Sequence, residues 1–248
     1  MTNNYTLEIA CFSITGARVA EAAGAHRIEL CENPEEGGTT PSYGTLKIIQ
    51  DMIKIPVFPI IRARGGDFVY SAEEKKVMLE DLRLCRELGF PGAVVGALLS
   101  DGNGDLEFIR QMRSEAIHMQ LTFHRAFDRS VNPLRLMEQL IKEGYNRILS
   151  SGQYPQVMQG LGLLKKLTEE AAGKICIMPG SGLNSRNVME IARFAPFSEF
   201  HTAARKAFHP EGVFSPSSMN ETLQYTITDA MEIKAILNQL NLHFGKPS

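Results

Sequence analysis

Strand-sized apolar segments alternate with longer amphipathic segments along the whole chain. The apolar segments predict strands at residues 6–12, 26–31, 56–61, 92–97, 118–124, 146–150, 174–179 and 197–201. The amphipathic segments predict helices at residues 14–24, 42–53, 72–88, 105–115, 132–143, 156–171 and 185–194, and a last helix at 228–241. Eight strands that are each followed by a helix, within 248 residues, are typical of an α/β protein with the (β/α)8 TIM-barrel fold.

Residues that favour helix ends support these boundaries. Ser71 and Asp105 stand where an N-terminal cap is expected, and Pro133 follows Asn132 at a first helical position. Four glycines fall between a predicted helix and the next strand: Gly24, Gly89, Gly144 and Gly173. The regular spacing of these signals supports eight repeating strand–helix units.

An open, doubly wound sheet is the alternative fold. A Gly-x-Gly-x-x-Gly turn after the first strand would favour it, but that turn holds only Gly16. Because no Pro/Gly/Ser-rich linker divides the chain, residues 1–248 are predicted to form one domain. Residues 205–227 form a long connection after the last strand, which we expect over the barrel mouth or at a subunit contact.

Composition and charge restrict the partners. Hydrophobic residues make up 44% and charged residues 22% of the chain, as in ordinary globular proteins. The net charge is -2 and no basic run is present, which argues against nucleic acid as a partner. The apolar segments are too short to span a membrane, and the N-terminus lacks a signal-peptide pattern, so a cytoplasmic protein is expected. A homo-oligomer is plausible for a barrel of this size.

The alternation of side chains along each strand predicts which residues point into the barrel. Polar residues from five strands are expected to meet there: Glu8, Glu29, Arg62, His124, Glu199 and His201. Any one of them alone is more often structural, and Arg62 could simply pair with Glu8 or Glu29. A buried polar cluster of this size nevertheless requires internal pairing or a ligand, which favours a functional site.

Charged residues and glycines also gather where the strands end. The third strand continues into Arg64 and Asp67, and the fifth continues through His124 into Arg125 and Asp128. In parallel α/β proteins this edge carries the chemistry. Glycine loops and helix N-termini favour anions, so an anion site is predicted with these further residues: Ser151, Gly152, Gly180, Ser181, Gly182, His201 and Arg205.

These residues are compatible with an enzyme of isomerase or aldolase type. Glu8 or Glu29 would act as general base and His124 as general acid. The arginines Arg62, Arg64 and Arg125 would hold a carboxylate or phosphate metabolite, and Asp67 and Asp128 would orient them. No inward lysine ends a strand, which disfavours a Schiff base, and no organic cofactor is expected. A hard divalent metal held by the carboxylates and His124, and a binding module without chemistry, remain open alternatives.

Several strings of residues resemble the CutC family of copper homeostasis proteins. They are Arg27-Ile28-Glu29-Leu30-Cys31, Glu36-Gly37-Gly38-Thr39-Thr40-Pro41-Ser42, Arg64-Gly65-Gly66-Asp67-Phe68, Thr122-Phe123-His124-Arg125-Ala126-Phe127-Asp128 and Ser151-Gly152. The resemblance extends from about residue 7 to residue 205, and the family's segment after the last strand is not recognisable in 211–222. It implies a TIM barrel that takes part in cytosolic copper handling.

The resemblance also implies copper as the ligand. Cu(I) prefers thiolate and thioether ligands, and Cys11 and Cys31, which end neighbouring strands, are the natural pair. The alternation turns Cys31 into the barrel and Cys11 outward, so a site between them requires a bulge or a turn at Cys11. The sequence therefore leaves three readings: a Cu(I)-binding protein, an enzyme that acts on a small anionic metabolite, or a binding module without chemistry.

Overall fold

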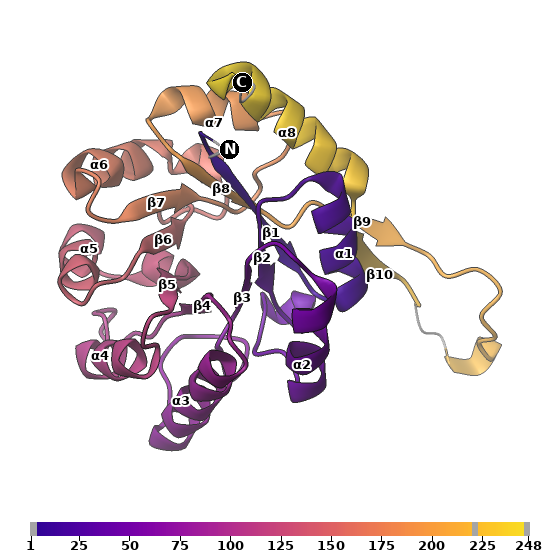
Figure 1. The fold of residues 1–248 in the computed structure, drawn as a ribbon, viewed down its shortest axis with the longest axis horizontal. Coiled ribbons are helices and arrows are strands. Elements are labelled where there is room, and N and C mark those ends of the chain that lie inside the picture. The colour runs from indigo at the N-terminus through magenta and orange to yellow at the C-terminus, as the bar shows by residue number, and fades with distance from the viewer. Residues whose placement is uncertain (1–3, 220–222, 246–248) are drawn as a thin grey trace.

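The computed structural model describes residues 4–219 and 223–245, and the chain forms a single-domain (β/α)8 barrel (Figure 1). The barrel strands are β1 (Thr6–Cys11), β2 (Arg27–Leu30), β3 (Val57–Pro59), β4 (Gly92–Val95), β5 (Gln120–Phe123), β6 (Arg147–Ser150), β7 (Cys176–Pro179) and β8 (Glu199–Thr202). The surrounding helices are α1 (Ile14–Ala23), α2 (Tyr43–Met52), α3 (Ala72–Glu87), α4 (Leu106–Glu115), α5 (Pro133–Lys142), α6 (Leu161–Ala171), α7 (Val188–Phe194) and α8 (Ala230–Phe244). The TIM-barrel prediction is confirmed.

The strands form two parallel four-stranded ladders that together make the barrel. One ladder has the order β3-β2-β1-β8 and the other has the order β4-β5-β6-β7. A parallel bridge between Ile60 and Val94 joins β3 to β4, and β7 lies beside β8. All eight carboxyl ends therefore meet at one rim, where the loops that follow the strands can build a site.

The predicted caps start the helices. Ser71 and Glu74 form a reciprocal capping box at α3, and the side chains of Asp105 and Asn132 accept backbone N–H groups of α4 and α5. The predicted helix at 156–171 begins later, at Leu161, because a short 3-10 helix and Gly160 precede it.

The long connection at 205–227, which we expected over the barrel mouth or at a subunit contact, contains two strands. Its ends pair as an antiparallel hairpin, β9 (Arg205–Phe208) with β10 (Tyr225–Thr228), which projects from the side of the barrel (Figure 1). Residues 220–222 of the connection lie outside the described residues. The pairing was missed because its two strands are separated by a long segment that carries no strand pattern.

The side chains of the strands divide into two apolar layers, as their alternation predicts. Leu7 and Ile28 belong to the large core between the sheet and the helices. Phe58, Ile60 and Cys31 belong to a small cluster inside the barrel. Most of the remaining lumen is polar, so its charged groups must be paired there or reserved for a ligand.

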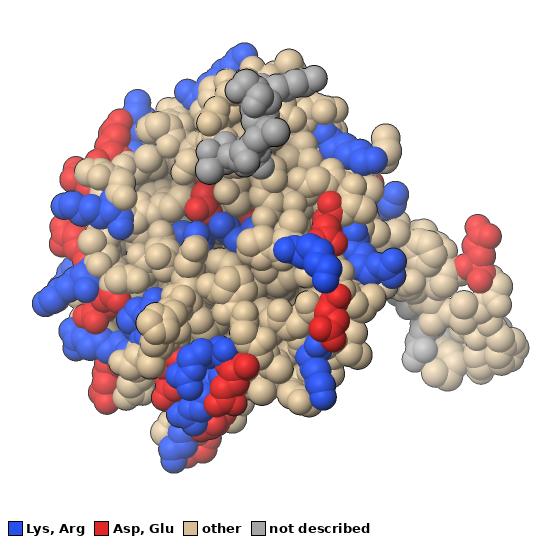
Figure 2. All heavy atoms as spheres, in the orientation of Figure 1, with Lys and Arg blue, Asp and Glu red and all other residues tan. Residues whose placement is uncertain are grey.

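The surface carries charges of both signs. Figure 2 shows one face, with Lys and Arg mixed among Asp and Glu around its edge. No helix of the described residues is long and apolar enough to cross a membrane.

Candidate functional site

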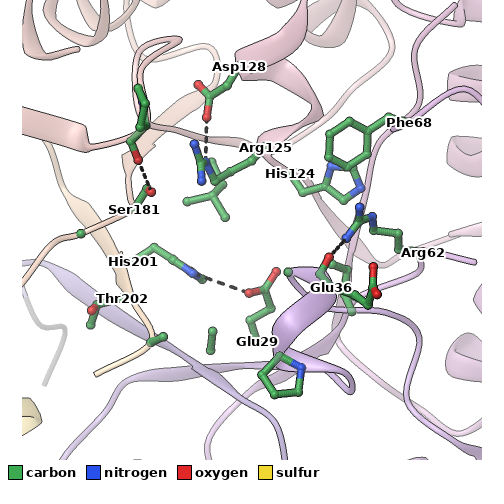
Figure 3. A pocket seen from close by; sticks show the side chains of 18 of the residues that line it. Glu29, Glu36, Arg62, Phe68, His124, Arg125, Asp128, Ser181, His201 and Thr202 are labelled. Atoms are coloured by element: carbon green, nitrogen blue, oxygen red, sulfur yellow. Dashed lines mark hydrogen bonds and ion pairs between the residues drawn. The ribbon is translucent and has the colours of Figure 1, made fainter. Parts of the chain in front are cut away.

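A cavity of about 780 Å³ opens at the carboxyl ends of the barrel strands (Figure 3). Side chains of the lumen form its floor, and the loops after the strands form its walls. It brings together many residues that the sequence predicted: Glu29, Arg62, His124, Arg125, Asp128, Ser181, Gly182, His201 and Arg205. The predicted edge of the barrel is therefore hollow and polar.

Arg62 brings a buried positive charge to this cavity. Its guanidinium Nη1 donates to the backbone oxygens of Glu36 at 2.6 Å and Gly38 at 3.0 Å, and Nη2 donates to that of Gly66 at 3.1 Å. The ring of Phe68 lies 4.9 Å from its Cζ. Among the described residues no carboxylate lies within ion-pair distance of Arg62, although the residue is only 5% exposed. The backbone fixes this guanidinium and leaves its charge without a counter-ion.

His124 lines the same cavity and keeps a hydrogen-bond donor buried at its wall. Its Nδ1 accepts the backbone N–H of Ala126 at 3.1 Å, which assigns the proton of the neutral ring to Nε2. Nε2 is buried and has no partner among the described residues. Burial, and then the charge of Arg62, lower the pKa of His124 to about 3. The imidazole is therefore neutral at ordinary pH and offers one free N–H.

Two carboxylates and a histidine form a buried chain beside these groups. His201 Nδ1 lies 2.8 Å from Glu8 Oε1, and His201 Nε2 lies 3.6 Å from Glu29 Oε2. Burial alone would raise the pKa of Glu8, but Arg27 and His201 hold it well below its usual range. Burial raises the pKa of Glu29 to about 7 although His201 opposes this rise. The two carboxylates thus differ: Glu8 is a fixed anion, whereas Glu29 can gain or lose a proton near neutral pH.

His201 links the two carboxylates. Burial alone would lower its pKa, but the hydrogen bond with Glu8 and the charges of Glu29 and Glu8 raise it. Figure 3 shows the His201 ring directed at the Glu29 carboxylate across the base of the cavity. The charge of His201 thus lowers the pKa of Glu29, and the charge of Glu29 raises the pKa of His201.

Below the cavity the lumen is closed by paired charges. Arg27 bridges Glu8 and Glu199, and Arg147 Nε donates to Glu199 at 3.0 Å. The guanidinium carbons of Arg27 and Arg147 lie 5.1 and 5.3 Å from the centroid of the Phe58 ring. Glu8 and Glu199 do not line the cavity. They are therefore structural partners of the arginines, and the prediction of Glu8 as a possible base loses its geometric support.

Asp128 organises one wall of the cavity. Its carboxylate accepts Arg125 Nε at 2.8 Å and the hydroxyls of Ser150 at 2.5 Å and Ser151 at 2.9 Å. Arg125 Nη2 also donates to the Ser151 hydroxyl at 2.8 Å. The loop after β6 is thus attached to the segment after β5, and Asp128 orients Arg125 as expected.

The glycine loops serve packing as well as the cavity. A side chain at Gly152 would lie 2.2 Å from the backbone oxygen of Gly160, and one at Gly180 would lie 2.5 Å from Leu149. Ser151, Gly152 and Gly180 do not line the cavity. Ser181, with a φ of 78°, and Gly182 do line it. The loop after β7 thus reaches the cavity with its predicted residues, whereas the loop after β6 reaches it only farther along, at Gln153, Tyr154 and Pro155.

Two further predicted residues, Arg64 and Asp67, lie away from the cavity, and other lining residues were not predicted. Arg64 donates to Asp67 at 3.1 Å and to Glu74 at 2.6 Å, and neither Arg64 nor Asp67 lines the cavity. Arg129 and Phe12 do line it although we did not predict them. Phe12 directly follows β1, and Arg129 follows Asp128 in the segment after β5. Their positions just after strands could have predicted that they line the cavity.

The cysteines do not form a metal site as they lie. Cys11 packs in the outer core and Cys31 in the inner cluster, on the two sides of the sheet, as their alternation predicts. Burial raises the pKa of Cys11 to about 12, and burial together with the nearby Glu29 raises that of Cys31 well above its ordinary value. Among the described residues no group of three or more His, Cys, Asp or Glu side chains could hold a metal ion. Because the two thiols lie on opposite sides of the sheet, they do not fit a Cu(I) site that both would share.

Comparisons with known proteins agree on one family. The model of the CutC family matches residues 5–206. A family protein CutC of Pectobacterium atrosepticum is 48% identical over 198 residues, which cover 80% of this chain and 78% of the relative. The human copper homeostasis protein cutC homolog is 43% identical over 203 residues, which cover 82% of this chain and 74% of the relative. The crystal structure of CutC from Streptococcus agalactiae superposes with a TM-score of 0.77 at 32% identity, over 80% of this chain and 98% of that one.

Proposed function

The chain belongs to the CutC family, and we propose that it takes part in the control of copper homeostasis. The support is the family match, which covers the barrel through β8, together with relatives that are named for copper homeostasis. The proposal concerns the process of copper homeostasis and names no copper ligands, because the two candidate cysteines lie on opposite sides of the sheet.

Growth in copper tests this role. We expect cells that lack the gene to be more sensitive to copper than their parent, and the wild-type gene to restore growth. The restored strain is compared with strains that carry Cys11→Ser/Cys31→Ser or Glu29→Gln. Rescue by the cysteine variant but not by Glu29→Gln would connect the copper phenotype to the cavity. Unchanged copper tolerance of the deletion strain would contradict the proposed role.

We further propose that the cavity binds a small anionic molecule. The observation that carries this proposal is Arg62, a buried guanidinium held by three backbone oxygens and paired with no carboxylate among the described residues. A buried charge without a partner is costly unless a ligand supplies the counter-charge. The unpartnered Nε2–H of His124 adds a neutral donor to the same cavity. The exposed Glu35 and Glu36 stand at the outer rim, so the attraction for an anion is centred on Arg62.

Binding of pyruvate and of inorganic phosphate, followed by calorimetry, tests this second proposal. Arg62→Met removes the charge and keeps much of the side-chain volume, and we expect it to weaken binding of either anion at least tenfold. Arg18→Met removes an exposed arginine of α1 and serves as the matched control. Equal affinities of the wild type and Arg62→Met would overturn the anion site.

A further inference from the structure

We propose that Glu29 is the catalytic acid–base residue of the cavity and exchanges a proton with a small carbonyl compound that carries a carboxylate or phosphate. The inference rests on the proposed anion site. It adds a reaction class, proton transfer at a carbon next to a carbonyl group, and a substrate class defined by one anionic group and one carbonyl. Glu29, Arg62 and His124 surround one opening in Figure 3.

Glu29 is the carboxylate that a ligand can reach. It lines the cavity, whereas Glu8 lies below it and is held by Arg27 and His201. A base must exchange its proton without breaking a strong ion pair, and Glu29 is 3.6 Å from His201 with no arginine bridge. The charged or titratable groups that face it are His201 from β8, Glu8 from β1, Arg27 from β2, and Cys31 directly after β2. Their balance holds the pKa of Glu29 near the range where a base is most effective.

The remaining polar groups match the charge that develops during the reaction. Glu29 removes a proton from the carbon beside the carbonyl, and the electron pair of the broken C–H bond forms a C=C bond. The carbonyl π pair moves to oxygen, which becomes an enolate oxygen. The Nε2–H of His124, which is buried at the cavity wall without a partner, donates to that oxygen after a small shift of the ring, while Arg62 holds the anionic group. Return of a proton from Glu29 to the same carbon, while the electron pair on oxygen re-forms the C=O bond, completes the cycle without any other reactant.

His124 has a different role from the general acid that the sequence predicted. A group with a pKa of about 3 cannot carry a second proton at neutral pH, but a neutral imidazole can donate a hydrogen bond. His201 is a positioning residue because it acts on the proton affinity of Glu29 and not on the carbonyl. The Glu8–His201 hydrogen bond at 2.8 Å fixes its ring.

Deuterium incorporation tests the proposal without knowledge of the natural substrate. Pyruvate and dihydroxyacetone phosphate, each in D2O with the full chain, are followed by proton NMR as their C–H signals are lost. We expect the wild type to accelerate exchange of at least one probe roughly 100-fold over buffer, the lower end of what acid–base catalysis supplies. Glu29→Gln should reduce exchange to the buffer rate while it leaves probe binding within threefold. Glu170→Gln, at an exposed glutamate of α6, should behave as wild type.

The pH profile distinguishes a tuned base from a structural carboxylate. Exchange should rise with pH and level off above about 7, as Glu29 loses its proton. His201→Gln removes the positive charge that lowers the Glu29 pKa, so the midpoint should move to higher pH. Probes that bind through Arg62 but never exchange, or exchange that survives in Glu29→Gln, would overturn the acid–base role and leave the anion site intact. Failure of both probes to bind the wild type would overturn the anion site and this inference with it.

Discussion

Replacement of Glu29 by glutamine should stabilise the folded chain at alkaline pH. Burial raises the pKa of Glu29 from 4.5 to about 7, so the folded state holds a proton that the unfolded state has released. Stability is therefore greatest below pH 4.5 with respect to this group, and it falls as pH rises through about 7. A pKa shift of this size lowers the free energy of unfolding by roughly 3 kcal/mol once Glu29 is ionised in both states. Glutamine has nearly the same shape and no charge, so it avoids this penalty.

Urea unfolding of the wild type and Glu29→Gln at pH 5 and pH 8 measures the effect. The variant should gain about 2 kcal/mol in free energy of unfolding relative to the wild type between these pH values, since loss of the Glu29–His201 attraction offsets part of the gain. Glu170→Gln controls for the loss of one surface charge. A difference between variant and wild type that does not change with pH would refute the argument that Glu29 is a buried carboxylate with a raised pKa.

Three further variants test the loops around the cavity and the role of the buried cysteines. Gly152→Ala should lower the free energy of unfolding by about 3 kcal/mol in urea titrations. The backbone φ at Gly152 is 71°, and the Cβ of an alanine there would lie 2.2 Å from the backbone oxygen of Gly160. An unchanged free energy of unfolding would contradict this packing. Asp128→Ala removes the acceptor of several hydrogen bonds from the loop after β6 and should cost about 2–3 kcal/mol in the same assay, whereas an unchanged midpoint would show that the loop is held otherwise. In a Cu(I) competition titration, Cys11→Ser/Cys31→Ser should bind copper as weakly as the reduced wild type; tight binding that the double variant loses would show that the buried thiols rearrange to bind it.

The barrel follows from patterns that are local in the sequence. Apolar strand segments, caps such as Ser71 and turn glycines such as Gly24 each act within a few residues, so eight strand–helix units could be predicted with boundaries close to those observed. The β9–β10 hairpin could not, because residues 205–208 and 225–228 pair across a long intervening segment. Pairing at that separation depends on where the chain returns and not on the composition of either strand.

The sequence by itself also determined which polar side chains enter the barrel, because alternation along a strand is fixed by backbone geometry. It did not determine their partners. Only the tertiary structure decided that Arg27 pairs with Glu8, which leaves Glu29 at the cavity, and that Arg147 pairs with Glu199 below it. Those choices depend on distances between strands and loops that are far apart in the chain, and burial among those neighbours sets the charge that each group carries.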